Sequence, residues 1–373
     1  MKRAISLPPV MFKFMKTGAR RRVLVLACAC LLMILALSGC QTIRFYSQAV
    51  AGQYEILVHQ TPLDELIKDP GTDPKLKAQL ELVLKIRQFA AQELKLRPDG
   101  SYLKYVDLHR PFVVWNVNVA PRLSLEPKTW WFPIVGSASY RGYFSQTGAR
   151  RYAAIWEKKG WDACVGDVTT YSTLGWFKDP LLNTFIFESE ADLADTIFHE
   201  LTHELLFIAG DTDFNEALAT MVAQEGVRRW FRESPDARGY ERYAEGVLHD
   251  NDFVKLVMAT RDDLQKVYDD ARLPEAAKLQ RKAEIIAQMR IHYATLKASW
   301  GVSKSGYDEW FAEPVNNAQL NTVAAYYDLV PAFQALLRAQ GGDMDKFYKA
   351  AGDLAKEPLP KRHEALHAYL NTR

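Results

Sequence analysis

The chain has 373 residues, and 48% of them are hydrophobic, so it is long enough for one large core or two smaller ones. Its 47 basic and 45 acidic residues nearly balance, and beyond the amino terminus no lysine-arginine cluster is interleaved with aromatic residues, which excludes the usual electrostatic footprint of a nucleic-acid-binding protein. Only one of the four cysteines, Cys164, lies beyond residue 40, which excludes a disulfide framework in the folded part.

Residues 1–39 are predicted to be a bacterial lipoprotein signal peptide. Seven basic residues and no acidic one come before the end of an apolar run from Val23 to Leu37, which is long enough for a signal peptide but short for a membrane-spanning helix. Leu37-Ser38-Gly39-Cys40 resembles a lipobox, so Cys40 is expected to carry lipid and to become the new amino terminus. An uncleaved signal anchor is the alternative. Without the signal peptide, 40 basic residues face 45 acidic ones.

Lipid on Cys40 would be the protein's anchor to a membrane. Bacterial sorting typically holds a lipoprotein in the inner membrane when aspartate follows the cysteine, but here Gln41 follows it. The sequence therefore predicts an outer-membrane lipoprotein whose folded part lies in the periplasm. Anchoring in the inner membrane is the alternative.

Residues 40–100 are predicted to be an N-terminal helical segment. Residues 41–58 look helical, and residues 76–96 repeat apolar side chains at helical spacing. Pro74 before the second stretch and Pro98 after it act as breaks.

Residues 101–235 are predicted to form a small sheet and a helical hairpin. Residues 113–119 alternate like a strand, and residues 130–135 and 162–170 look extended. A helix over residues 149–159 is expected to interrupt them. Cys164 lies in an apolar alternation and is expected to be a buried strand residue.

The segment Ile-Phe-His-Glu-Leu-Thr-His at residues 197–203 contains an H-E-x-x-H pattern. His199 and His203 are four residues apart, so in a helix both imidazoles leave the same face and can hold one zinc ion. Glu200 then points at the water on that ion and can act as its general base. The pattern therefore predicts a zinc-dependent hydrolase that attacks a peptide carbonyl with activated water.

A second H-E-x-x-H pattern starts at His363 and ends at His367. Pro358, Pro360 and Lys361 precede it, and only six residues follow it, so no ligand can come from downstream. We therefore interpret this copy as the solvated end of a terminal helix.

A catalytic zinc site needs a third protein ligand and keeps the fourth position for water. The helix with the two histidines is predicted to stop near Gly210, and the next helix starts so soon after it that the two must be antiparallel. His203 lies seven residues before Gly210 and Glu216 six residues after it, which makes Glu216 the favoured ligand. Asn215 is expected to steady this carboxylate or an approaching substrate strand. Glu225 is the fallback ligand.

Residues 236–373 are predicted to be a C-terminal helical region. Apolar residues keep a helical rhythm from Leu264 to Trp300 across Pro274, which indicates a long antiparallel helical pair. Residues 316–337 are expected to pack back on the catalytic region. Hydrolysis also needs a donor for the oxyanion. The sequence leaves five candidates open, namely Tyr240, Tyr243, His249, Tyr326 and Tyr327.

The chain resembles a bacterial family of zinc aminopeptidases, a branch of the gluzincin metallopeptidases. The segments that carry the resemblance are residues 46–49, 111–117, 124–130, 140–144 and 171–177, together with the H-E-x-x-H segment and residues 214–216. The resemblance implies an α+β, zincin-like core, in which a small mixed sheet lies beside the H-E-x-x-H helix and the glutamate-bearing helix. It implies one zinc ion held by His199, His203 and Glu216, with Glu200 as the base. Residues 167–173 are the candidate edge strand for a peptide substrate, with Tyr171 as a candidate contact.

The sequence departs from better-known relatives at two points. Thermolysin-like enzymes carry an aspartate four positions after the ligand glutamate to orient a histidine, but Thr220 stands there, which leaves Asp195 and Asp213 as candidates. The Gly-Ala-Met-Glu-Asn segment that captures a free amine is absent from the sequence. A non-catalytic, zinc-stabilised lipoprotein that binds peptides or assists assembly is the competing interpretation. Glu200 argues against it, because a structural site gains nothing from that carboxylate.

Overall fold

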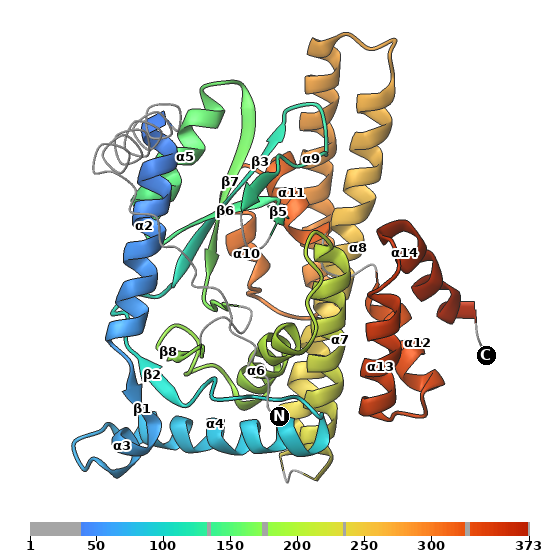
Figure 1. Ribbon diagram of the computed structural model, residues 1–373. Coiled ribbons are helices and arrows are strands. Elements are labelled where there is room, and N and C mark those ends of the chain that lie inside the picture. Colours follow the sequence, from blue (N-terminus) through green and yellow to red (C-terminus); the bar gives the residue numbers. More distant parts are fainter. Residues whose placement is uncertain (1–38, 133–135, 174–177, 234–235, 325–328, 372–373) are drawn as a thin grey trace, which may run out of the picture. The chain divides into compact units, whose positions relative to one another are not determined.

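The computed structural model describes residues 39–132, 136–173, 178–233, 236–324 and 329–371 (Figure 1). Contacts divide the chain into two compact units, residues 1–52 and residues 53–373. The signal-peptide segment before Gly39 lies outside the described residues. Helix α2 (Gly39–Val58) confirms the helix expected for residues 41–58. Among the described residues, no helix has both the length and the apolar character needed to cross a membrane.

The second unit is an α+β fold that mixes small sheets with many helices (Figure 1). After the end of α2, its first elements are β1 (Thr61–Pro62), α3 (Leu63–Lys68), α4 (Pro74–Glu93), β2 (Lys104–Val106), β3 (Val114–Pro121), β4 (Trp130–Phe132), β5 (Gly136–Ala138), β6 (Tyr140–Tyr143), α5 (Gln146–Glu157), β7 (Trp161–Val168) and β8 (Leu181–Leu182). The elements that follow are α6 (Glu190–Leu205), α7 (Thr212–Trp230), η1 (Phe231–Glu233), α8 (Ala237–Asp269), α9 (Glu275–Ser299), α10 (Tyr307–Trp310), α11 (Asn317–Ala324), α12 (Val330–Ala339), α13 (Met344–Leu354), α14 (Leu359–Ala368) and η2 (Tyr369–Asn371).

The largest antiparallel sheet has the strand order β6-β3-β7. Its register places Asn116 of the central strand opposite Gly142 on one side and Gly166 on the other, so these residues share a face. Helix α5 packs on β3 and β7, and it buries Ala149 and Ala153. The alternation in residues 113–119 had indicated such a strand, because one face is covered and the other is not.

The expectation of a mixed sheet beside the metal site needs a correction. The sheet β6-β3-β7 is antiparallel throughout, because both edge strands run opposite to β3. The mixed sheet is a separate one with the order β1-β2-β8, in which β2 pairs antiparallel with β1 and parallel with β8. Strands β4 and β5 form a third, two-stranded antiparallel sheet.

Helices α6 and α7 form an antiparallel pair in the main core (Figure 1). The two helices approach closely at Gly226, where a Cβ would lie 2.5 Å from a ring carbon of Phe198. Only glycine allows this approach. Helix α4 packs across α6, and α12 packs on α7 through Phe333, whose ring centre lies 4.9 Å from that of Phe214. The hairpin that carries the predicted metal ligands is therefore held on two sides.

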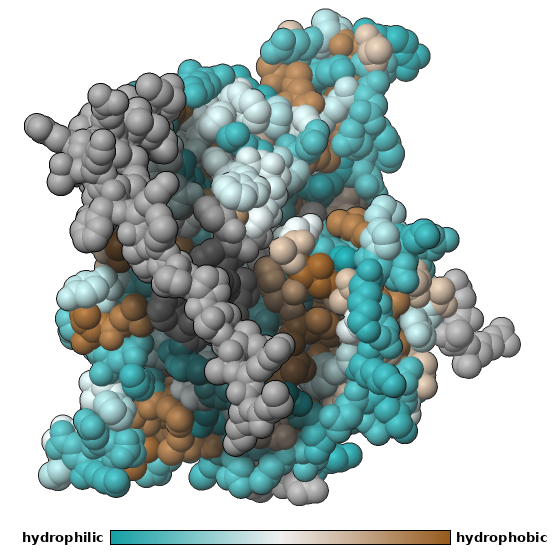
Figure 2. Space-filling view, viewed as in Figure 1, coloured by the Kyte–Doolittle hydropathy of each residue, from teal (hydrophilic) through white to brown (hydrophobic). Residues whose placement is uncertain are grey.

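Helices α8 and α9 form the long antiparallel pair predicted from the rhythm between Leu264 and Trp300. Their shared side belongs to a second hydrophobic cluster that contains Val257, Leu264 and Met289. The right-hand side of this pair is hydrophilic in Figure 2. The prediction that residues 316–337 pack back on the rest is confirmed for the described part, because α11 lies on β3 and β7 and α12 lies on α7.

Candidate metal centre and its cleft

Helix α6 is capped by Ser189, whose hydroxyl accepts a hydrogen bond from the main-chain N–H of Asp192. Ile197 and Leu201 are fully buried, and they anchor the helix in the core. The helix ends at Leu205, five residues before the predicted stop at Gly210, because Leu206 adopts an extended conformation. The helix end was therefore predicted wrongly.

The loop between α6 and α7 is held by the side chain of Asn215. Its amide nitrogen donates to the carbonyl oxygen of Ile208 at 2.8 Å, and its oxygen accepts from the N–H of Ile208 at 2.9 Å. Because Asn215 directly precedes Glu216, this pair of bonds positions the first turn of α7. Asn215 also lines the cleft beside the metal cluster. Its predicted contact with substrate stays a prediction.

Three donor atoms converge where α6 faces the start of α7, just after its first turn. The Nε2 atoms of His199 and His203 are 3.1 Å apart, and Oε2 of Glu216 lies 3.2 Å from the first and 3.6 Å from the second. Donor atoms at about 2.1 Å from a tetrahedral zinc ion are about 3.4 Å apart, so these separations fit one such ion. Two imidazoles and one carboxylate are also a donor set that suits catalytic zinc. The structure thus brings together the three ligands predicted from the hairpin.

The charges of the cluster agree with a cation site. Burial alone would lower the pKa of His199, but the carboxylates of Glu216, Glu200 and Asp195 outweigh it and raise that pKa to about 9. Burial would raise the pKa of Glu216, but its bonds to both histidines lower it far below the usual value. The site therefore concentrates negative charge around two imidazoles, which favours a positively charged occupant.

The alternative ligands are engaged elsewhere. The carboxylate of Glu225 accepts hydrogen bonds from Arg228 and Arg229 at 2.6–2.8 Å, so it is not free to bind a metal. In the second H-E-x-x-H copy, Nε2 of His363 lies against Asp211, and Arg362 bonds the same carboxylate. Within the described ranges, the only group of three candidate ligands is His199, His203 and Glu216.

A cleft of about 510 Å³ opens beside the three donors. Its walls come from α6 and α7 on one side and from β3, β6 and the end of β7 on the other. Glu200 lines this cleft, and none of the described residues hydrogen-bonds its carboxylate. The predicted base is therefore in the cleft, and within the described part of the chain its carboxylate is not engaged by another group.

The segment at residues 167–173 lies beside His199 as expected, but it was predicted to be a strand throughout, whereas β7 ends at Val168. Strand β7 is an edge strand, and residues 168–172 line the cleft together with His199. Asp179 holds this segment, because its carboxylate accepts bonds from the N–H of Thr173 at 2.9 Å and from the hydroxyl of Ser172 at 3.2 Å. Tyr171 packs edge-on against Phe144 at 5.4 Å. Residues 174–177 of the family-like segment lie outside the described residues.

Tyr140 is a candidate functional residue that the sequence analysis missed. It lies in the edge strand β6, opposite Asn118, and lines the metal cleft. Its side chain is 42% exposed as a whole, but loss of solvation around the hydroxyl and the charges of Glu216 and Glu200 raise its pKa to about 12. The phenol therefore stays protonated at neutral pH near the carboxylates of Glu216 and Glu200. Its position in the family-like segment 140–144 was the only available signal.

Three of the five oxyanion donors proposed from the sequence, Tyr240, Tyr243 and His249, do not line this cleft. Tyr243 donates its hydroxyl proton to Asp195, Tyr240 packs near Phe231, and His249 stacks on Trp300 at 4.4 Å. Tyr326 and Tyr327 lie outside the described residues.

The two second-sphere candidates suggested for the histidines, Asp195 and Asp213, have different surroundings. Asp195 acts on His199 through its charge, but it is hydrogen-bonded to Tyr243. Asp213 lies exposed in the first turn of α7. Among the described residues, Nδ1 of His203 is buried without a hydrogen-bond partner. Packing therefore helps to position the imidazole of His203. One of its neighbours is Phe207, and the two ring centres are 6.3 Å apart.

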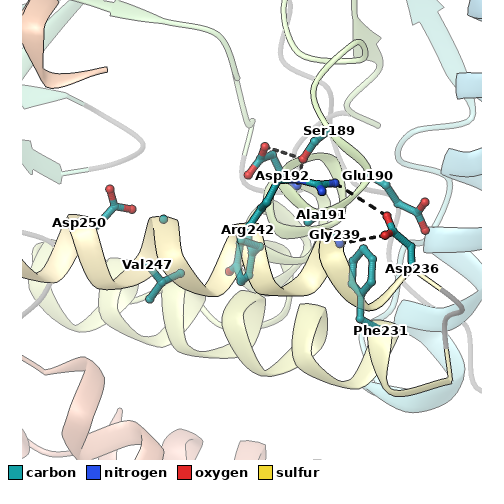
Figure 3. A pocket seen from close by; sticks show the side chains of 12 residues that line it. Ser189, Glu190, Ala191, Asp192, Phe231, Asp236, Gly239, Arg242, Val247 and Asp250 are labelled. Carbon is teal, nitrogen blue, oxygen red and sulfur yellow. Dashed lines mark hydrogen bonds and ion pairs between the residues drawn. The ribbon is translucent and has the colours of Figure 1, made fainter. Parts of the chain in front are cut away.

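A separate cavity of about 390 Å³ lies between the start of α6 and helix α8. Four of its polar residues pair within the lining, because Ser189 bonds Asp192 and Arg242 pairs with Asp236 at 3.9 Å (Figure 3). Its lining contains no histidine or cysteine among the described residues. This cavity therefore lacks the chemistry of the metal cleft, from which Asp195 and Tyr243 separate it.

Comparisons with known proteins agree with the chemistry of the cleft. A family model described as "Putative aminopeptidase" matches residues 44–366. No curated protein and no solved structure matches the chain. The matched range includes every residue of the metal cluster and its cleft.

Proposed function

Because the chain belongs to the putative aminopeptidase family, we propose that its metal cleft hydrolyses peptide bonds in a zinc-dependent reaction. The observation that carries this proposal is the convergence of His199, His203 and Glu216 beside Glu200. The family description supports peptidase activity, and the donor set supports zinc as the metal. When bound, such an ion supplies Lewis-acid activation of water and of the peptide carbonyl.

The residues of the chain divide the remaining work. Glu200 accepts the proton of the attacking water and delivers it to the leaving amine nitrogen. Tyr140 donates a hydrogen bond to the carbonyl oxygen as negative charge develops on it, because its phenol keeps its proton. The desolvated cleft strengthens both interactions relative to water.

The wall opposite α6 orients the substrate. An extended peptide adds to the exposed edge of β7 and follows residues 167–173 past the metal cluster. Asp179 keeps the last part of this wall in place through its bonds to residues 172 and 173. Tyr171 presents an aromatic side chain to the bound peptide from the same wall.

A mixed peptide library tests this proposal. Full-length protein in detergent is incubated with the library, with and without a metal chelator, and products are identified by mass spectrometry. We expect cleavage that the chelator abolishes and zinc restores, and loss of several orders of magnitude in the isosteric variant Glu200→Gln at unchanged zinc content. Peptide binding without cleavage by the wild-type protein would instead favour the non-catalytic lipoprotein. The position of the cut bond distinguishes an aminopeptidase from an endopeptidase.

The proposed location is the periplasmic side of the outer membrane. Support comes from the lipobox-like residues that end at Cys40 and from Gln41 after it. The single cysteine beyond residue 40 suits an exported protein, because it has no wrong partner within the chain. The enzyme would then act on periplasmic peptides from a lipid anchor.

A further inference from the structure

A second groove continues the metal cleft along the outer edge of β7. It has a volume of about 530 Å³ and is lined by every residue from Ala163 to Val168. The groove and the cleft share four lining residues, Asn116, Tyr140, Val168 and Thr212. Six strand residues span about 16 Å, the length of about five residues of an extended peptide. A substrate that lies beside Val168 in the cleft can therefore continue into the groove.

The main chain of β7 offers free hydrogen-bonding groups to this groove. The carbonyl oxygen of Ala163 accepts a bond from the side chain of Asn316, so this residue faces away from the neighbouring strand β3. Backbone direction alternates along a strand, so Val165 and Asp167 face outward as well. No described residue forms a hydrogen bond with their main chain on this side. An added strand would pair with these two residues.

Gly166 makes the floor of the groove flat. Its backbone is not in the left-handed region, and a Cβ at this position would have no atom within 4 Å. A larger side chain would thus occupy the groove without strain in the protein. Asn116, its partner on β3, lies on the same face and lines both the groove and the cleft.

The groove is bordered by an excess of negative charge. Among its described lining residues, Asp167, Glu309 and Glu313 oppose the single cation Arg150, which lies 3.4 Å from Glu313. The negative charge also acts on Cys164 in the floor of the groove. Burial is the main cause that raises the pKa of its thiol to about 12, and the charges of Glu313 and Asp167 add to this shift. Cys164 lies in a strand as predicted, but it is half-buried and not buried as the sequence had indicated. An extended segment with positive charge would fit this border.

We propose that the groove along β7 is a substrate subsite for a cationic peptide segment that lies up to about five residues from the cleaved bond. The positive charge comes from lysine or arginine side chains or from the free amino terminus of the peptide. The inference rests on the proposed peptidase function and adds the class of peptide that the enzyme selects. Exposed ion pairs each contribute less than about 1 kcal/mol, so we expect several of them to act together.

The test starts from one neutral peptide that the wild-type protein cleaves. This peptide is extended at either end by three lysines or three glutamates, and its amino terminus is free or acetylated. We expect kcat/KM to be about 10-fold higher for the lysine extension than for the glutamate extension at one end. The double variant Glu309→Lys/Glu313→Lys should reverse this preference, and Glu245→Lys on the exposed side of α8 should keep it. If acetylation of the amino terminus by itself removed the increase in kcat/KM, the free amino terminus would be the cation that the groove binds.

A binding measurement separates this inference from the proposed function. Calorimetry with Glu200→Gln should give a Kd about 10-fold lower for the lysine-extended peptide than for the glutamate-extended one. Gly166→Val should weaken the binding of both extended peptides, with an unchanged circular-dichroism spectrum. Hydrolysis without a charge preference would overturn the inference and leave the function intact. A charge preference in binding without hydrolysis by the wild-type protein would overturn the function and support the subsite.

Discussion

His363 and Asp211 form a contact that joins helix α14 to the α6–α7 hairpin with the candidate metal ligands. Nε2 of His363 lies 3.0 and 3.1 Å from the two carboxylate oxygens of Asp211, and Arg362 bonds the same carboxylate. Asp211 caps α7, because its side chain accepts from the N–H of Phe214 at 3.2 Å. The contact therefore fixes the first turn of α7, which directly precedes Glu216. The expectation of a solvated helix end is wrong for Arg362 and His363, because their partner is buried in the hairpin.

Arg362→Met should destabilise the protein by about 3 kcal/mol, because it leaves Asp211 buried without its main cationic partner. Methionine keeps much of the packing against Phe214, so the loss in the free energy of unfolding comes mainly from the missing charge of Arg362. Denaturant unfolding in the presence of chelator measures it. Lys361→Met, which changes the exposed neighbour, is the matched control and should have almost no effect. Equal stability of the two variants would show that the Arg362–Asp211 pair contributes nothing.

Glu216→Ala should sharply lower zinc occupancy, because it removes one of three converging donors. Glu225→Ala and His367→Ala should bind zinc like the wild-type protein, because neither side chain belongs to the cluster. Metal analysis of the purified variants after dialysis against limiting zinc decides between them. Zinc loss from the Glu225 or His367 variant, with Glu216→Ala unaffected, would require a different ligand set.

Tyr140→Phe should lower kcat by about 10²–10³-fold, because it removes one donor to the developing oxyanion. Zinc content and KM should change little, since the phenyl ring still fills its place in the cleft. Tyr171→Phe is the matched control on the same wall. Burial and then the charges of Asp179 and Tyr140 raise the pKa of Tyr171 to about 12, but Glu200 and Glu216 do not contribute to this shift. A larger loss of kcat in the Tyr171 variant would move the donor role to that residue.

Cys40→Ser should abolish labelling by radioactive fatty acid and leave unprocessed precursor at the inner membrane. The physical reason is that the lipid is attached to the sulfur atom of the cysteine. The hydroxyl of serine cannot replace the thiol in this lipid-transfer reaction. Membrane fractionation and labelling in cells measure both effects. Replacing Cys164 with serine is the control, because Cys164 lies in β7 of the folded part. Wild-type protein without fatty-acid label would contradict the lipoprotein proposal and leave the metal chemistry unaffected.

Local spacing was sufficient to predict the metal hairpin. Two histidines four residues apart share a helix face, and a short turn makes the next helix antiparallel, so Glu216 was placed opposite them without any long-range information. The alternation in residues 113–119 likewise predicted β3, because a strand with one covered face shows its period directly. These features depend on residues that are close in the sequence.

Only the tertiary structure decided which distant residues join the hairpin. Tyr140 precedes Glu200 by 60 residues and reaches the cleft through the pairing of β6 with β3. Both copies of the H-E-x-x-H pattern have the same internal spacing, but α14 packs against Asp211 and uses its first histidine as a structural contact. A short motif specifies the relative direction of its own side chains. The partners that those side chains meet depend on chain folding over more than a hundred residues, which local spacing does not encode.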